Sequence, residues 1–263
     1  MFDVSGKIGL ITGGTQGIGA AIAKEFLQAG LRGIAILART EGKGLQVVKD
    51  LNEEFGDGKA IFIQTDVADK KQFDDAFKRT IEVFKNIDIV VNNAVVDSGR
   101  NWEKYIAVNL TGPITGTFLA FENYIPKYRT GQEGVIINIS SVAGLYGNAG
   151  APHYAASKAG VIELSRSIGN DIHYNRVKVK VIAICPGYTD TPGVLVTEEN
   201  YLGAPYFKAY QDRVKDLRPQ PSTTVSKAVV DVIKKGRNGS VWIVMDNQPP
   251  YEVRLEINKV INM

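Results

Sequence analysis

The chain has 263 residues, of which 31 are basic and 28 acidic, and it contains two histidines and one cysteine. This near balance of charge, without a run of Lys or Arg, argues against nucleic acid as a partner, and so little histidine and cysteine argues against a zinc site and an internal disulfide. The sequence has no stretch of about eighteen apolar residues that would predict a membrane span, and its first residues lack the apolar core of a signal peptide. We therefore expect one α/β domain over residues 1–263, located in the cytoplasm.

A glycine-rich segment follows the first predicted strand, residues 7–12, and precedes a helix predicted over residues 20–29. Missing Cβ atoms let the backbone approach a phosphate, and the start of the helix offers free N–H groups. We expect this loop to hold the pyrophosphate of a dinucleotide; a glycine turn that binds nothing is the alternative. The residues that would form the loop are Gly13, Thr15, Gln16, Gly17, Ile18 and Gly19.

The second predicted strand, residues 33–38, is followed by Arg39 and Thr40, and no carboxylate occurs before Glu41. An acidic side chain at this point binds the ribose hydroxyls of NAD, whereas arginine accommodates the 2′-phosphate of NADP. The pattern therefore favours NADP(H), with NAD(H) as the alternative. Two points weigh against NADP(H): Arg39 can be a plain surface charge, and Gln16 stands in the glycine loop where a second basic residue would have helped.

Polar residues also follow the third and fourth predicted strands, residues 60–65 and 87–91. The Asp66 carboxylate can accept a hydrogen bond from an adenine amino group, or it can cap the next helix. The consecutive asparagines after the fourth strand suit the bridging of backbone groups in a tight turn. The residues expected along the cofactor groove here are Asp66, Val67, Asn92, Asn93 and Ala94.

Residues 102–128 predict a long helix that contains Gly112 and Pro113. A proline inside a helix bends it and leaves backbone groups unpaired. The Asn109 side chain could hold a water near this bend; the alternative is an amide that bonds within its own helix.

Residues 138–158 contain a strand end, a glycine-rich loop and the start of a helix, and they follow the strand predicted over residues 134–139. Tyr154 and Lys158 are one helical turn apart, so their side chains share a helix face. A free phenol has a pKa near ~10, and a nearby cation lowers that pKa toward neutral pH. Tyr154 is therefore a candidate general acid/base, and Ser141 can hydrogen-bond the oxygen of a carbonyl or an alcohol.

The same spacing occurs a second time, between Tyr174 and Lys178, where Val161 takes the place of the serine. For either pair the alternative is an exposed contact on a helix surface. Cys185 lies in an apolar run, so we expect it in the core rather than as a nucleophile.

Beyond these motifs, strand and helix patterns keep alternating, and the turn over residues 186–192 follows a strand end, where open α/β sheets bind ligands. Residues 193–221 break the alternation and carry apolar and aromatic side chains; we expect a substrate lid there, with core packing as the alternative. Residues 246–263 carry no pattern that predicts an element. The later elements are predicted as helix 154–174, strand 178–184, helix 222–235 and strand 240–245.

This alternation predicts a Rossmann-like, doubly wound fold: a seven-stranded parallel sheet with helices on both faces. All the polar clusters follow strand ends, so the fold brings them to one edge of the sheet.

Together these motifs resemble the short-chain dehydrogenase/reductase family over residues 5–245. Residues 12–19 resemble its cofactor signature, and residues 61–69 and 101–104 resemble its hydroxyprostaglandin dehydrogenase branch. The stretch near Arg39 is similar to the insect short-chain alcohol dehydrogenases. The family's catalytic tetrad matches Asn109, Ser141, Tyr154 and Lys158.

The resemblance implies that Tyr154 is the general acid/base, with Ser141 holding the substrate oxygen. It implies that Lys158 lowers the tyrosine pKa and holds the nicotinamide ribose, and that Asn109 supports a water relay. The turn beside the nicotinamide would add cofactor contacts from Pro186, Gly187, Thr189 and Thr191.

The sequence departs from the family at Val95, where glycine is usual, and at Ala38, where the NAD-preferring relatives carry Asp. The second departure favours NADPH and carbonyl reduction. The family resemblance also implies a homodimer or homotetramer formed through the helices at 102–128 and 154–174.

We expect an oxidoreductase that interconverts a lipophilic secondary alcohol and a ketone, such as a steroid, an isoprenoid or a hydroxy-lipid. An NAD-dependent alcohol or hydroxyprostaglandin-like dehydrogenase is one alternative, and a non-catalytic dinucleotide-binding scaffold is another. The expected substrate contacts are Val95, Ser141, Leu145, Tyr146, Tyr188 and Leu195.

Overall fold

The structure of the chain is a computed structural model that describes residues 2–96, 100–192 and 197–253. Most strands are short and fully buried, as expected for a parallel sheet covered on both faces. The strands are β1 (Ile8–Thr12), β2 (Gly33–Ala38), β3 (Ala60–Gln64), β4 (Ile89–Asn92), β5 (Gly134–Ile139), β6 (Val179–Pro186), β7 (Thr189–Asp190), β8 (Gln220–Pro221), β9 (Val241–Val244) and β10 (Tyr251–Val253).

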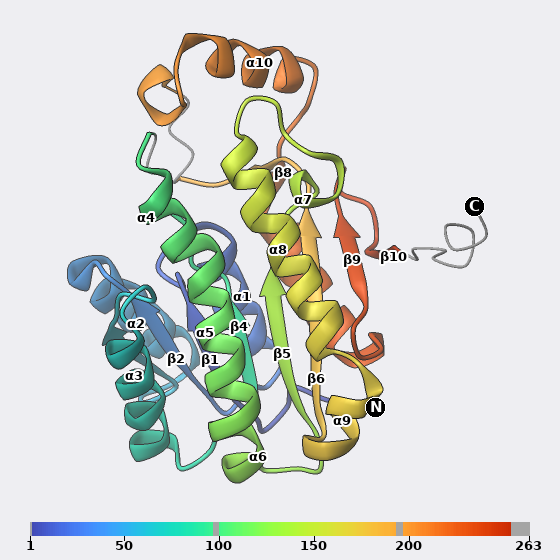
Figure 1. The fold of residues 1–263 in the computed structure, drawn as a ribbon. Helices are drawn as coiled ribbons and strands as arrows, with labels where there is room; N and C mark the ends of the chain where they lie inside the picture. Colours follow the sequence, from blue (N-terminus) through green and yellow to red (C-terminus); the bar gives the residue numbers. More distant parts are fainter. Residues whose placement is uncertain (1, 97–99, 193–196, 254–263) are drawn as a thin grey trace.

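Within the described residues the main sheet has eight strands in the order β10-β9-β6-β5-β4-β1-β2-β3 (Figure 1). Strand β1 pairs in parallel with β2 on one side and with β4 on the other, so the strand order reverses beside β1. Ligands bind outside the carboxyl ends of strands at such a reversal. The doubly wound, mostly parallel sheet expected from the sequence is confirmed.

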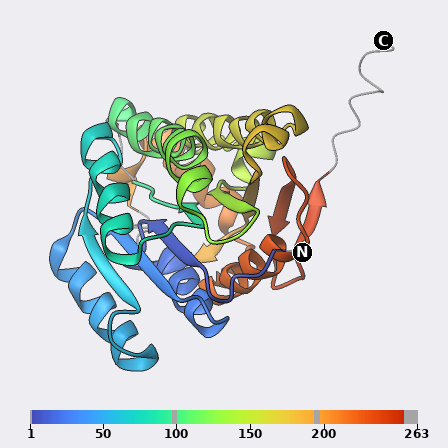
Figure 2. The same ribbon diagram turned by 90° about the horizontal axis from the view of Figure 1, so that it is seen from below.

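Helices cover both faces of this sheet, as Figure 2 shows from below. On one face, α1, α2 and α11 bury residues such as Phe26, Leu51 and Val229. On the other, α3 and the helices between β4 and β5 bury Phe77 and Phe121. The longer helices are α1 (Gly17–Gln28), α2 (Glu41–Phe55), α3 (Lys70–Phe84), α8 (Pro152–Ile168), α10 (Ala204–Val214) and α11 (Ser222–Lys235). The shorter ones are α4 (Trp102–Ile106), α5 (Gly112–Phe118), α6 (Ile125–Tyr128), α7 (Ala143–Tyr146) and α9 (Asp171–Val177).

The helical run between β4 and β5 contains two π-helical stretches, Ala107–Thr111 and Leu119–Tyr124. Pro113 and Pro126 are each the second residue of the α-helix that follows such a stretch. A proline has no N–H to give to the carbonyl four residues before it, and the π turn is one way for a helix to absorb that loss. The expected irregularity at Pro113 therefore takes the form of a π turn that contains Asn109.

The single helix expected over residues 154–174 is wrong. The structure has two helices, α8 and α9, which are separated at Gly169 and Asn170. A Cβ on Gly169 would collide with the backbone of Gly239, so a glycine is required where these two turns meet. The Asn170 side chain accepts a hydrogen bond from the Ile172 N–H and caps α9.

Strand β10 was not expected. It pairs antiparallel with β9, so the sheet has one strand more than the seven parallel strands anticipated. The turn before it places Asp246 and Asn247 at positive φ, a conformation that asparagine and aspartate tolerate better than most residues. Because the turn contains no glycine, its sequence gave little warning of a hairpin. None of the described helices is both long and apolar enough to cross a bilayer.

Candidate active site

The glycine loop joins β1 to α1 at the strand-order reversal. Gly13 and Gly17 have positive φ, which only glycine adopts without strain. The α1 N-cap residue, Gln16, makes no capping hydrogen bond to the first turn. The N–H groups of that turn are therefore left for an anion, and the positive end of the helix dipole points the same way. These features fit a pyrophosphate.

The Asn93 side chain holds this loop to the end of β4. Its Nδ2 donates to the carbonyl oxygens of Thr12 and Gly13 at 3.0 and 3.1 Å. The Thr12 hydroxyl in turn accepts from the N–H groups of Asn93 and Ala94 at 3.0 and 2.9 Å. Gly19 must lack a Cβ, because one would collide with both Gly13 O and the Asn93 Nδ2. Asn93 thus bridges backbone groups, as expected.

Asn92 lies elsewhere than the groove expected for it. It is buried, and its Nδ2 donates to Asn138 Oδ1 at 2.8 Å and to Thr117 Oγ1 at 3.3 Å. Asn138 passes the network on to Ser165 at 2.9 Å. Asn92 points to the opposite side from Asn93 because consecutive side chains of an extended chain alternate. Its place is in a polar network within the core.

The edge expected to meet the adenosine ribose carries two cations. Arg39 is exposed at the end of β2, and its carbonyl accepts a hydrogen bond from Gln64 Nε2 at 3.0 Å. Lys43, in the first turn of α2, places its Nζ 3.1 Å from Gln16 Oε1 of the glycine loop. The sequence interpretation missed Lys43, although its place in the first turns of the helix after Arg39 could have signalled it.

Asp66 follows β3, and its carboxylate accepts from the Ala68 N–H at 3.0 Å. The cap of the next helix is Asp69, whose side chain accepts from the N–H groups of Lys71 and Gln72. Asp69, and not Asp66, therefore caps the next helix. Val67 is buried against Gly112.

Tyr154 stands in the first turns of α8 and Ser141 just beyond β5, so one helix and one strand end present the two hydroxyls to each other. Burial raises the pKa of Tyr154, and a hydrogen bond with Ser141 acts in the opposite direction. The Ser141 Oγ also accepts from the Ala143 N–H at 3.2 Å. The Tyr105 ring meets the Tyr154 ring edge-on at 6.2 Å and forms a wall on the α4 side.

Lys158 is buried one turn further along α8. Its Nζ donates to Ile139 O at 2.9 Å and lies 5.7 Å from the centre of the Tyr154 ring. Burial lowers the pKa of Lys158 to about 8. The lowered phenol pKa expected from the sequence is not found here, because burial of Tyr154 raises its pKa by more than the hydrogen bond with Ser141 lowers it.

Asn109 is fully buried in the π turn between α4 and α5. Its side-chain amide makes a two-way contact with the backbone of Val96: Oδ1 accepts from the N–H at 2.9 Å and Nδ2 donates to the carbonyl at 3.0 Å. Both ends of the amide are thus used to hold the segment after β4. The alternative of an amide bonded within its own helix is not what the structure has.

The turn after β6 faces the glycine loop. A Cβ on Gly17 would lie 3.2 Å from the Thr191 side chain, so these two expected cofactor residues are brought together. The Gly187 N–H donates to Val244 O at 2.8 Å, and the Thr189 hydroxyl donates to Gly187 O at 2.9 Å. Two further expected residues belong to this turn. Pro186 is the last residue of β6, and Tyr188 is half-buried between Gly187 and Thr189.

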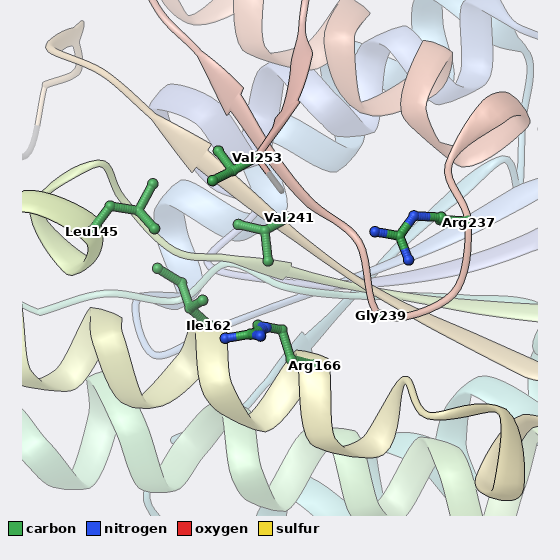
Figure 3. Close-up of a pocket in the computed structure, with 7 residues that line it drawn as sticks. All are labelled: Leu145, Ile162, Arg166, Arg237, Gly239, Val241 and Val253. Carbon is green, nitrogen blue, oxygen red and sulfur yellow. The ribbon is translucent and has the colours of Figure 1, made fainter. Parts of the chain in front are cut away.

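Two of the expected substrate residues expose large apolar surfaces: Tyr146 is 67% exposed and Val95 58%. Leu145 points elsewhere. It lines a small pocket with Ile162, Val241 and Val253, beside Arg166 and Arg237 (Figure 3). Leu195 lies outside the described residues.

The segment expected to form a lid contains α10, which lies above the carboxyl ends of the strands in Figure 1. Its aromatic side chains pack on one another: Tyr201 lies 5.4 Å from Phe207 and 5.0 Å from Tyr210 between ring centres. The Arg213 Nη1 donates to Gly147 O at 2.6 Å, which ties α10 to the loop before α8. The segment thus has both a packed interior and a position over the site.

The second tyrosine–lysine pair is structural. The Tyr174 hydroxyl donates to Glu133 Oε1 at 2.6 Å, and Lys178 ends α9 in a left-handed conformation. Cys185 is buried, as expected, and burial raises the pKa of its thiol to about 12.

Comparison with known proteins gives one consistent result. The model of the short chain dehydrogenase family matches residues 7–201. The chain is 36% identical over 243 residues to 15-hydroxyprostaglandin dehydrogenase (NAD+) of Mus musculus, covering 90% of this chain and 89% of that protein. It is 39% identical over 214 residues to the Homo sapiens protein of the same name, covering 81% and 79%.

Among solved structures, a short chain dehydrogenase/reductase from Burkholderia phymatum in complex with NAD has a TM-score of 0.78 at 23% identity. The match covers 95% of this chain and 91% of that one. At this level of identity the likeness shows the fold.

Proposed function

The chain belongs to the short-chain dehydrogenase/reductase family and is an NAD(P)-dependent oxidoreductase, and from this premise we propose that it interconverts a lipophilic secondary alcohol and the corresponding ketone. The observation that carries the proposal is the meeting of Ser141, Tyr154 and Lys158 at the edge of the sheet where the glycine loop opens. A scaffold that only binds a dinucleotide would not need this set of side chains.

The nicotinamide cofactor supplies hydride chemistry when bound, and the chain's residues manage the substrate oxygen. The Ser141 hydroxyl donates to that oxygen and orients it. The Tyr154 hydroxyl gives its proton to the oxygen in reduction and takes it back in oxidation. Lys158 lies close enough to stabilise a phenolate through its charge.

Asn109 acts one layer further out. Because both ends of its amide hold Val96, it fixes the segment that leads to Val95. We assign Asn109 a positioning role at the substrate side of the site. The water relay that the family resemblance implies for Asn109 stays a prediction.

For the cofactor we propose a preference for NADP(H). No carboxylate stands at Ala38, and the cations of Arg39 and Lys43 flank the place where a 2′-phosphate would bind. Lys43 supplies the second basic group that the glycine loop itself lacks.

The relatives favour a second candidate, an NAD-dependent hydroxyprostaglandin-like dehydrogenase, since both mammalian proteins above are named for NAD+. Titration calorimetry with NADPH and NADH decides between the two. An affinity for NADPH at least about tenfold higher supports the first candidate, and the reverse supports the second.

The lipophilic substrate class rests on the exposed apolar side chains of Val95, after β4, and Tyr146, in the helix after Ser141. We propose that residues 193–221 act as the substrate lid. The test is a panel of steroid, isoprenoid and hydroxy-lipid alcohols and their ketones, followed through the absorbance of the reduced cofactor. Turnover of short polar alcohols alone would contradict the proposal.

A further inference from the structure

A buried glutamine bridges the turn after β6 to the end of β9. Gln220 is 1% exposed, and it belongs to the two-stranded sheet of β7 and β8. Its Nε2 donates to the Thr189 hydroxyl at 3.2 Å and to Val244 O at 2.8 Å, and its backbone N–H donates to Tyr188 O at 2.9 Å.

These contacts converge on one short stretch of backbone. Val244 O also accepts from the Gly187 N–H at 2.8 Å, so Gly187 and Gln220 share one acceptor. The Thr189 hydroxyl accepts from Gln220 and donates to Gly187 O at 2.9 Å. The glutamine therefore restrains the turn at two residues: Tyr188, which precedes β7, and Thr189, the first residue of β7.

The amide orientation follows from its partners. The carbonyl of Val244 is an acceptor only, and the Thr189 proton is used on Gly187, so both must face the –NH2 end. The Gln220 Oε1 is left buried without a hydrogen bond among the described residues. A buried, unsatisfied oxygen is costly, and an apolar side chain of similar length would avoid that cost. The two donor contacts must therefore offset it.

We propose that Gln220 is a positioning residue for the nicotinamide half of the cofactor, acting through Thr189 and the Gly187 backbone. This inference rests on the proposed function, in which the 186–191 turn meets the nicotinamide. It predicts that loss of the Gln220 amide weakens binding of the nicotinamide half and leaves the adenosine half unaffected, since no hydrogen bond within the described residues joins Gln220 to the glycine loop or to Lys43.

The test compares two probes by titration calorimetry: NADPH, and 2′,5′-ADP, which lacks the nicotinamide. Gln220→Leu should lower the affinity for NADPH about tenfold, as expected for two lost hydrogen bonds, and leave the affinity for 2′,5′-ADP unchanged. Gln248→Leu is the matched control, because this glutamine is exposed on the turn before β10, and it should change neither affinity.

Gln220→Glu gives a second, independent variant. At pH 8 its carboxylate faces two oxygen acceptors and should weaken NADPH binding at least as much as the leucine does. Burial at this position raises the pKa of the new carboxyl above the usual value of about 4.3, so toward pH 5 a protonated fraction can again donate one hydrogen bond and part of the affinity should return. Wild-type protein measured over the same pH range corrects for other titrating groups, and this variant decides the question if Gln220→Leu does not fold.

Equal weakening of both probes would show a merely structural role and overturn the inference, as would unchanged NADPH binding. If the wild-type protein binds 2′,5′-ADP and NADPH, these outcomes leave the proposed function standing. If the wild-type protein binds neither NADPH nor NADH, the proposed function fails, and this inference fails with it.

Discussion

The Lys158 ammonium lies 5.7 Å from the centre of the Tyr154 ring and is held there by a 2.9 Å hydrogen bond to Ile139 O. The carbonyl that holds the lysine belongs to Ile139, the last residue of β5, two positions before Ser141. One strand end thus positions the serine and anchors the cation, while α8 supplies the phenol. A small shift of α8 against β5 would disturb all three groups.

Burial of Lys158 should appear in the pH dependence of stability. Burial lowers the pKa of Lys158 from its ordinary value of 10.5 to about 8 in the folded protein, so between these values the unfolded chain binds more protons and stability rises with pH. The stability gained through Lys158 is complete above the pKa of the unfolded chain, 10.5, and is lost as the pH falls through the folded pKa of about 8. In urea unfolding between pH 8 and pH 10, wild-type stability should rise relative to Lys158→Met.

The control for this measurement is Lys178→Met, which removes the lysine of the second pair. It should track the wild-type protein across the same range. A wild-type curve parallel to that of Lys158→Met would contradict the assignment of a buried, weakly basic lysine.

The ribose edge gives a prediction about cofactor choice. Lys43→Ala should lower the affinity for NADPH about tenfold, the usual size of a lost charged hydrogen bond, with little effect on NADH. Lys49→Ala, an exposed lysine further along the same helix, is the control. Calorimetry that found equal losses for NADPH and NADH would remove Lys43 from the 2′-phosphate site.

The buried network around Asn92 gives a prediction about stability. A Cβ on Gly116 would collide with Asn92 Oδ1 and approach the Phe73 ring to 2.8 Å, so Gly116→Ala should destabilise the fold by about 1–3 kcal/mol through overpacking. Gly42→Ala is the contrast, because Gly42 lies in α2 with open space around it. It should be neutral or stabilise by up to about 1 kcal/mol in urea unfolding.

The lid hypothesis can be tested at the contact between α10 and the loop before α8. Arg213→Ala removes the hydrogen bond to Gly147 O and should raise the KM for a lipophilic substrate several-fold, while the Kd for cofactor stays constant. Arg218→Ala changes an exposed arginine of the same segment and should have little effect. Unchanged KM in Arg213→Ala would favour core packing as the role of this segment.

Much of the fold was predictable because its signals are local. Apolar runs bounded by glycine marked β2 and β5, and the bounds expected for both agree with the structure. The site motifs follow strand ends, so the doubly wound topology alone brings them to one edge. Features that depend on contacts across the fold were missed: the break at Gly169 is set by Gly239, and β10 is set by its pairing with β9.

The same division holds within the site. Ser141, Tyr154 and Lys158 share a spacing that can be seen in the sequence. Gln220 has no such signal, because its side-chain partners lie more than twenty residues away along the chain, Thr189 across the β7–β8 pairing and Val244 at the end of β9. The raised pKa of Tyr154 was also out of reach, since it comes from burial rather than from the spacing of charges.

The most direct test of the account is Tyr154→Phe, assayed for both cofactor binding and turnover of the substrate found in the panel. The account predicts a loss of turnover of at least about a hundredfold, the usual scale for removal of a general acid/base, with the Kd for cofactor unchanged. Tyr174→Phe, which alters the second tyrosine–lysine pair, should keep full turnover. Retained turnover in Tyr154→Phe would contradict the central claim that this phenol moves the proton.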